Sequence, residues 1–278
     1  MWSRVGRPSV NELRGFAVLG HPIGHSLSPR IHDAGFRARG LEDCRYVAVD
    51  VPQPESWADV VKTLRQDGFW GFNLTRPLKE LVASSSRLTT RDRWAVATGA
   101  VNTLMVRGSD ATGVWSGANT DAPAFLQSVE ARSLTPRTAL VFGSGGAARA
   151  SLAALEAAGA AVTLAARRPP RFPVRWVDME AGLYAARDAE LVVNATPVGQ
   201  AGEGSWSRLP VFSAGQTVVD WVYAPPATPF LQAAAAGGAR CIGGIELLVR
   251  QAALAWVHWF GEAGPLAAMG RAVGWDPP

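Results

Sequence analysis

The sequence predicts an α/β protein of two domains with a cleft between them. Short apolar runs that suit buried strands alternate with helical segments along most of the chain. One strand-turn-helix-strand unit occupies residues 138–168, and an independent series of strands and helices precedes it. A length of 278 residues with 48% hydrophobic content is enough for two cores.

The unit at 138–168 carries a glycine-rich turn. After the apolar run 138–142, Gly143, Gly145 and Ala148 fill the small positions of G-x-G-x-x-G/A, and an alanine-rich helix follows over 147–158. Because glycine has no Cβ, the backbone amides at the start of this helix can approach a pyrophosphate. The unit therefore predicts a Rossmann-type dinucleotide-binding domain, with a tight turn that binds nothing as the alternative.

The end of the next strand, 161–166, distinguishes between two dinucleotides. Units that bind NAD carry Asp or Glu here, whereas the 2′-phosphate of NADP requires cations. The chain has Arg167 and Arg168 at this point, and arginine can hold a phosphate through two hydrogen bonds. We expect NADP as the cofactor, and a solvated basic turn is the alternative.

Composition and charge disfavour other classes of protein. No apolar run approaches the ~20 residues of a membrane span, and residues 1–15 lack the apolar core of a signal peptide, so a cytoplasmic protein without a membrane partner is expected. The 27 Lys and Arg residues give a net charge of +4 but form no dense run. Nucleic-acid binding is therefore not expected.

Cysteine and histidine spacing indicates neither a disulfide nor a metal site. Cys44 and Cys241 stand apart in predicted strands, so we expect buried free thiols. His21, His25 and His32 do not have the spacing of a ligand set, and hydrogen bonds in loops or helix caps are the expected use.

The first strand, 16–20, runs into a loop that contains two prolines and precedes a helix starting near Pro29. Ser26 and Ser28 lie two residues apart in this loop, so their hydroxyls can face one side and donate to a carboxylate or a sugar-like hydroxyl. A serine before proline is also a good helix N-cap, which is the alternative for Ser28.

Polar residues follow the strand predicted at 68–74. Ligands of open α/β sheets bind at the carboxyl ends of strands, and this one ends at Asn73, followed by Thr75 and Lys79. Lys79 is the candidate general acid, because a cation at a helix start opposes the helix dipole. An ordinary exposed lysine is the alternative. Asp121 is its candidate partner or, alternatively, only an N-cap.

Further elements follow from apolar runs and turn residues. A β-hairpin is predicted with arms 100–107 and 114–120 around a turn at 108–113. Other strands are predicted at 46–51, 174–179, 191–195, 217–223 and 240–242. Other helices are predicted at 54–67, 123–130, 229–236 and 246–259, with a short helix within 87–97.

Seven motifs together carry a family resemblance: HPIGHSLSP, NLTRPLK, GAVNTL, GANTDA, GSGGAARA, NATPVG and DWVYAPPATPFL. In order and approximate spacing the chain resembles the shikimate dehydrogenases from Phe16 to Gln251. The resemblance implies NADPH-dependent reduction of 3-dehydroshikimate to shikimate by a monomer or homodimer. It also implies a substrate-binding domain at 1–120, an NADP-binding domain at 121–244, and helices at 245–278 that pack back on the first domain.

The resemblance also assigns roles to residues. Lys79 and Asp121 are the implied catalytic pair. The implied substrate contacts are Ser26, Ser28, Asn73, Thr75, Asn102, Tyr223 and Gln251. The implied cofactor contacts are Gly143, Ser144, Gly145, Gly146, Ala147, Ala166, Arg167, Arg168, Thr196, Val222 and Gly244.

The chain departs from the family pattern at three places. Ala166 and Arg168 replace the Asn and Thr of the family's Asn-Arg-Thr. Glu246 and Leu247 replace a frequent Gly-Met beside the nicotinamide, where they either alter contacts with the ring or face solvent. Ala122 and Pro123 stand where glycine is common, and the proline stiffens the link between the domains.

Three alternatives share the architecture. A quinate/shikimate dehydrogenase usually favours NAD, and Arg167 without a nearby acid argues against it. A non-catalytic binding module of the same fold would lack Lys79 or Asp121, and both are present. A methylenetetrahydrofolate dehydrogenase does not suit the HSLSP loop.

Overall fold

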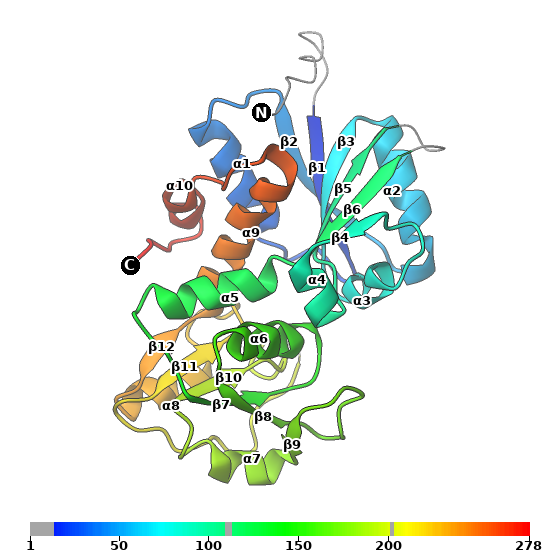
Figure 1. Ribbon diagram of the computed structural model, residues 1–278. Coiled ribbons are helices and arrows are strands. Elements are labelled where there is room, and N and C mark those ends of the chain that lie inside the picture. Colours follow the sequence, from blue (N-terminus) through cyan, green and yellow to red (C-terminus); the bar gives the residue numbers. More distant parts are fainter. Residues whose placement is uncertain (1–13, 109–112, 201–202) are drawn as a thin grey trace.

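Two six-stranded β-sheets form the framework of the computed structural model, which describes residues 14–108, 113–200 and 203–278 (Figure 1). The first sheet has the order β2-β1-β3-β5-β6-β4, with β1 parallel to β2 and β3 and with β5 antiparallel to β3 and β6. Its strands are β1 (Arg14–Gly20), β2 (Cys44–Asp50), β3 (Phe69–Leu74), β4 (Thr90–Arg91), β5 (Thr103–Arg107) and β6 (Val114–Ala118).

Helices cover both faces of this sheet. On one face, α1 and the late helices α9 and α10 pack around Phe16 and Trp256, whereas α2 and α3 enclose Phe72 and Leu104 on the other. These helices are α1 (Ser28–Ala38), α2 (Trp57–Gln66), α3 (Leu78–Ala83), α9 (Gly244–Phe260) and α10 (Leu266–Arg271), with α4 (Arg93–Thr98) at the edge near α6.

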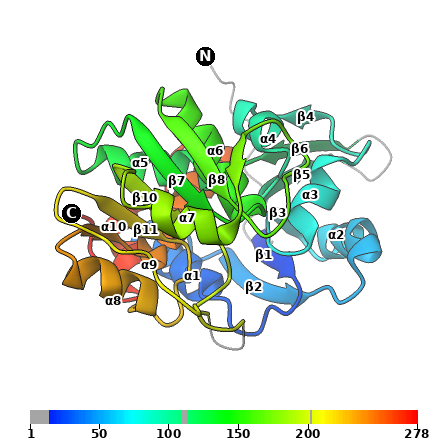
Figure 2. The ribbon, with the colours of Figure 1, turned by 90° about the horizontal axis from the view of Figure 1, so that it is seen from below.

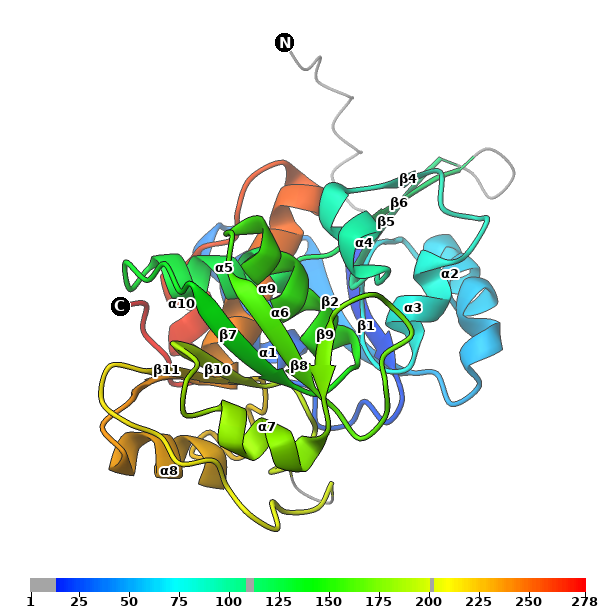
Figure 3. The same ribbon diagram turned by 60° about the horizontal axis from the view of Figure 1, so that its bottom comes forward.

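The second sheet is parallel throughout, with the order β12-β11-β10-β7-β8-β9. Helices α5 and α6 cover one face and α7 and α8 the other (Figure 3), so the central strands are buried almost completely. The strands are β7 (Thr138–Phe142), β8 (Ala161–Ala165), β9 (Arg175–Val177), β10 (Leu191–Asn194), β11 (Thr217–Asp220) and β12 (Arg240–Ile242). The helices are α5 (Asp121–Glu130), α6 (Gly146–Ala157), α7 (Met179–Ala185) and α8 (Pro229–Ala236).

The chain passes between the two sheets twice. Helix α5 leads from β6 into β7, and α9 leads from β12 back to the first sheet, where it contacts α1, β3 and β5. The two connecting helices also pack against each other. Seen from below, the second sheet and its helices lie in front of the first sheet (Figure 2).

The predicted elements are present, with corrections at their ends. The strand predicted at 174–179 is limited to β9, because Asp178 caps α7 by accepting a hydrogen bond from the amide of Ala181 at 2.8 Å. Helix α7 was not among the predicted elements. The strand predicted at 217–223 ends at Asp220, and the helix predicted at 54–67 begins as a 3₁₀ turn over Pro54–Ser56.

Three further predictions concern smaller features. Most of the hairpin turn at 108–113 lies outside the described residues. Cys44 and Cys241 are free thiols but only half-buried, which corrects the expectation of buried ones. Within the described ranges, no helix has the length and apolar character needed to cross a membrane.

Candidate active site

A cavity of about 460 Å³ lies between the two sheets, within the usual size of a small-molecule site. Its first wall comes from the loops that follow β1 and β3, which are adjacent parallel strands. Its second wall comes from the start of α6, the loop after β11 and the start of α9. The predicted catalytic and substrate-binding residues line it, except Asn102: Ser26, Ser28, Asn73, Thr75, Lys79, Asp121, Tyr223 and Gln251.

Lys79 and Asp121 form an ion pair in this cavity. The Nζ of Lys79, at the start of α3, lies 2.5 Å from Oδ2 of Asp121, the first residue of α5. The Asp121 side chain is 5% exposed and that of Lys79 is 24% exposed. Asp121 is not the cap of α5, because Asn119 Oδ1 accepts from the amides of Asp121 and Ala122, both at 3.1 Å. The carboxylate is therefore free to bind Lys79.

The serine loop lines the same cavity as this pair. Ser28 is the first residue of α1, and its side chain makes no capping hydrogen bond, so the N-cap alternative does not describe it. Its amide instead donates to Oγ of Ser26 at 3.3 Å. Both serines line the cavity, as does the exposed His25.

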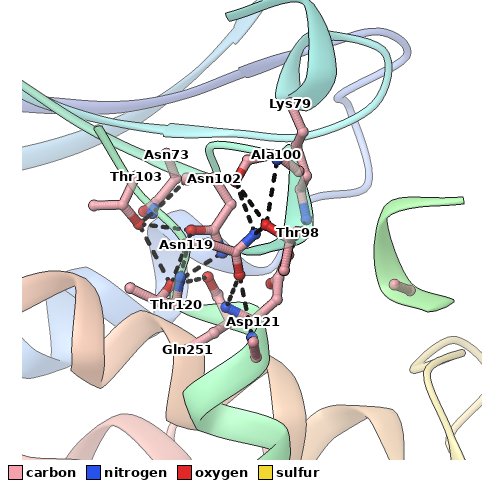
Figure 4. A network of polar contacts seen from close by, with 12 residues as sticks. Asn73, Lys79, Thr98, Ala100, Asn102, Thr103, Asn119, Thr120, Asp121 and Gln251 are labelled. Carbon is pink, nitrogen blue, oxygen red and sulfur yellow. Dashed lines mark hydrogen bonds and ion pairs between the residues drawn. The ribbon is translucent and has the colours of Figure 1, made fainter. Parts of the chain in front are cut away.

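Asn102 lies behind the cavity wall and is 1% exposed. Its Oδ1 accepts from the amide of Thr120 at 2.8 Å, and its Nδ2 donates to Oγ1 of Thr120 at 3.0 Å. Figure 4 shows this contact in a polar network that reaches Gln251 of α9, whose Oε1 lies 3.5 Å from Oγ1 of Thr120. In this conformation Asn102 orients the segment that leads into Asp121.

A second cavity of about 510 Å³ adjoins the first and is lined by Gly145 and Gly146 at the start of α6. Gly143 has φ +111°, and a Cβ there would lie 2.7 Å from the carbonyl oxygen of Ala195, so the turn requires glycine. A Cβ at Gly145 would meet no atom within 4 Å. The empty space beside Gly145 and the uncapped helix start suit the close approach of a pyrophosphate.

Thr196 and Val222 also line the second cavity, and buried polar residues fix both. Asn194 Oδ1 accepts from the amide and the hydroxyl of Thr196, at 3.0 and 2.6 Å. Asp220 Oδ1 accepts from the amide of Val222 at 2.9 Å, and burial raises the pKa of this carboxyl to about 6. These contacts hold the loops after β10 and β11 at the edge of the sheet.

The remaining predicted cofactor residues lie at different places. Ala147 lines both cavities and Gly244 lines the first, where a Cβ would lie 2.6 Å from backbone atoms of Trp221 and Val222. Ser144 is exposed and Ala166 is buried, and neither lines these cavities. Arg167 and Arg168 are exposed, and neither has an ion pair with a described residue.

Glu246 does not face solvent, so that one of the two alternatives predicted for this position is wrong. It is 2% exposed, and Arg132 donates to both of its carboxylate oxygens at 3.0 and 2.8 Å. Arg250 donates to the same carboxylate at 2.9 Å. Because Arg132 follows the end of α5, this cluster joins the two helices that connect the sheets.

Trp221 lines both cavities but was not among the predicted site residues. Its indole N–H donates to Oγ of Ser151 at 2.9 Å, and its ring stacks on Phe125. The sequence feature that could have identified Trp221 is its position directly after a buried strand of the parallel sheet, because ligands bind at the carboxyl ends of such strands.

Comparisons with known proteins identify the family. A family model described as the shikimate dehydrogenase substrate binding domain matches residues 18–104. The chain is 40% identical over 277 residues to the shikimate dehydrogenase (NADP(+)) of Salinibacter ruber, covering 91% of this chain and 94% of the relative.

Two solved structures share the fold over almost their whole length. Shikimate 5-dehydrogenase from Thermus thermophilus, in complex with NADP(H) and shikimate, matches with a TM-score of 0.81 and 39% identity, covering 93% of this chain and 97% of that one. Shikimate dehydrogenase from Aquifex aeolicus matches with a TM-score of 0.82 and 30% identity, covering 94% and 97%. The chain therefore belongs to the shikimate dehydrogenase family.

Proposed function

We propose that the protein catalyses the reversible NADPH-dependent reduction of 3-dehydroshikimate to shikimate, a step towards the aromatic amino acids. The observation that carries this proposal is the Lys79–Asp121 pair, in a cavity bounded by the serine loop on one side and the glycine-rich turn on the other. A Cβ at Gly146 would lie 3.9 Å from Cδ of Lys79, so the turn faces the pair directly.

The substrate binds in the first cavity. Ser26 and Ser28 line this cavity, and their hydroxyls can donate to the substrate carboxylate. Burial raises the pKa of Tyr223, so its phenol stays protonated and can donate as well. Thr75 and Gln251 supply further polar contacts from the opposite walls. This arrangement suits a small, highly hydroxylated carboxylic acid.

NADP fits the second cavity and the exposed loop after β8. The amides at Gly145 and Gly146 can bind its pyrophosphate, and the exposed guanidinium groups of Arg167 and Arg168 are free to bind its 2′-phosphate. When bound, NADPH supplies the hydride for the ketone carbon of the substrate.

Lys79 supplies the proton in the same reaction. Its Nζ holds the proton that the ketone oxygen needs as charge develops on it, and in shikimate oxidation it takes that proton back. Asp121 orients the ammonium and can accept a hydrogen bond from a substrate hydroxyl. Because the side chain of Asp121 is nearly buried, little water competes for these contacts.

The domain division follows the two sheets. We assign residues 1–120 to the substrate-binding and catalytic domain, 121–244 to the NADP-binding domain and 245–278 to the helices that pack on the first. The contacts of α9 with α1, β3 and β5 support the last assignment. A cytoplasmic location and a monomeric or homodimeric state stay predictions of the sequence.

A steady-state assay tests the proposed function. Shikimate and quinate are each offered with NADP⁺ and NAD⁺, and formation of the reduced nicotinamide is followed by absorbance. We expect the highest kcat/KM with shikimate and NADP⁺. A preference for quinate or NAD⁺ would support the quinate/shikimate alternative, and no turnover with any pair would support the non-catalytic one.

A further inference from the structure

Tyr46 lies in β2 behind the first cavity, is 4% exposed, and is not one of the residues that line it. Its hydroxyl donates to Oδ1 of Asn73 at 2.7 Å. The ring of His32 stacks on it at 4.2 Å with an interplanar angle of 6°. Tyr46 is therefore a buried side chain whose polar atom points at a residue of the cavity wall.

The hydrogen bonds of Asn73 are almost fully used within the protein. Both protons of its Nδ2 have acceptors, the carbonyl oxygen of Asn102 at 3.2 Å and Oγ1 of Thr103 at 3.1 Å. Because the Asn102 carbonyl can only accept, it fixes which side of the amide carries the nitrogen. The hydroxyl of Tyr46 then occupies one of the two acceptor positions of Oδ1.

From Asn73 the network continues to groups that face the cavity (Figure 4). Thr103 donates to Oδ1 of Asn102 at 3.1 Å, and the same oxygen holds the amide of Thr120, the residue before Asp121. Thr120 in turn contacts Gln251. Through Asn73, Tyr46 thus joins a chain of buried hydrogen bonds that reaches Thr120 and Gln251, and its hydroxyl also lies beside the side chain of Ser28.

We propose that Tyr46 is a positioning residue for substrate binding, acting through Asn73, and that Asn73 orients Asn102 and Thr103 instead of donating to the substrate. This inference rests on the proposed function and revises the direct substrate contact that the family resemblance implies for Asn73. Asn73 has no N–H left to donate, and its Oδ1, which accepts from Tyr46, also lies beside the buried ring of His32.

The test is a double-mutant cycle on the full-length enzyme with Tyr46→Phe and Asn73→Leu. Loss of one neutral hydrogen bond predicts that Tyr46→Phe raises KM for shikimate by about three- to tenfold. We expect kcat and KM for NADP⁺ to stay within about twofold of the parent. Tyr184→Phe is the matched control, because Tyr184 is 49% exposed on α7, and it should leave KM unchanged.

The double variant separates action through Asn73 from an independent effect. If Tyr46 acts through Asn73, adding Tyr46→Phe to Asn73→Leu raises KM by less than about twofold, whereas independent effects multiply. Multiplied effects would overturn the proposal. An unchanged KM in Tyr46→Phe with a lowered Tm would also overturn it, because the tyrosine would then only stabilise the fold.

Two further measurements keep the outcome decisive. If Tyr46→Phe does not fold, Thr103→Val interrupts the same network at its next link and should raise KM for shikimate in the same way. Activity of the parent enzyme with shikimate is measured first. Its absence would contradict the proposed function, whereas an active parent with an unaltered Tyr46→Phe variant contradicts only this inference.

Discussion

Lys79 and Asp121 stand 42 residues apart in the sequence, yet their charged groups are 2.5 Å apart in the cavity. The pair forms because β3 ends in a loop that starts α3 with Lys79, while α5 starts with Asp121 at the edge of the same sheet. Asn119 supplies the helix cap and leaves the Asp121 carboxylate free. Two chain segments thus bring an acid and a base into one site.

The first prediction follows from this pair. Positioned proton transfer contributes about 10²- to 10⁴-fold to rate, so Lys79→Ala should lose that much in kcat while the dissociation constant for shikimate changes far less. Asp121→Asn should also lower kcat, and the losses in the double variant should not add, because the two residues act as one unit. Lys79→Ala with more than about a tenth of the parental kcat would refute the proton-transfer role.

The second prediction concerns the cofactor. A charge-assisted hydrogen bond to the 2′-phosphate is worth about 1.5 to 3 kcal/mol, so the enzyme should bind NADP⁺ at least about tenfold more tightly than NAD⁺. Arg167→Ala should remove most of this difference. Titration calorimetry with both nucleotides measures this difference in affinity. The control is Arg187→Ala, because Arg187 is also exposed and follows α7 in the same domain. Undiminished discrimination in Arg167→Ala would place the phosphate elsewhere.

The sequence could predict most of this site because its residues follow strands. Apolar runs located β1, β3, β7 and β10, and the polar residues just after such runs meet at one edge of a sheet. The same reasoning placed Lys79 and Asp121 in one cleft, although no periodicity gives the distance between them. The glycine-rich turn was readable because Gly143 has a positive φ that other residues rarely adopt.

Other features could not be predicted because they depend on contacts between distant segments. Asn102 looks like a ligand in its motif, and only the fold shows that its side chain also forms hydrogen bonds with Thr120 and Thr103. Glu246 looks like a surface residue of α9 until Arg132, 114 positions earlier, is placed beside it. Local patterns carry no information on such pairs.

The third prediction concerns the serine loop. Removing a hydroxyl that donates to a carboxylate costs about 1.5 to 3 kcal/mol, so Ser26→Ala and Ser28→Ala should each raise KM for shikimate about ten- to hundredfold. The dissociation constant for NADP⁺ should not change, because neither serine lines the second cavity. If both variants keep the parental KM for shikimate, the loop serves the fold and not the substrate.

The fourth prediction is a pH dependence of stability that arises at His32. This side chain is fully buried, and the loss of solvation that a charged ring would suffer lowers its pKa from 6.5 to about 3. Trp256 donates a hydrogen bond to its Nδ1. The unfolded chain binds a proton at His32 below pH 6.5 and the folded one does not. The contribution of His32 to the free energy of unfolding is therefore fully present above pH 6.5. It falls by about 1.4 kcal/mol for each pH unit between pH 6.5 and pH 3.

Urea unfolding at pH 7 and pH 5 measures this effect. The parent should lose about 2 kcal/mol more than His32→Gln over this interval, because glutamine cannot take up the proton. Glutamine can still accept the hydrogen bond of Trp256, so the variant should fold. An equal loss in both proteins would mean that His32 is protonated in the folded state.

The last prediction concerns the buried carboxylate that joins α5 to α9. Glu246 accepts hydrogen bonds from Arg132 and Arg250, whose side chains are 22% and 9% exposed, so Glu246→Leu would leave two cations close together with little water. Breaking a buried ion pair on one side costs about 3–5 kcal/mol, and a loss of this size should appear in the free energy of unfolding. Arg132→Ala should cost less, since Arg250 still pairs with the carboxylate.

Replacing the whole cluster distinguishes charge from packing. Buried ion pairs can be exchanged for apolar groups of similar size at little cost, so Glu246→Leu combined with Arg250→Met and Arg132→Met should recover most of the stability lost in Glu246→Leu. Urea unfolding of the parent and the three variants gives the comparison. A Glu246→Leu protein within about 1 kcal/mol of the parent would show that solvent reaches both arginines and that the cluster adds little to the junction of α5 and α9.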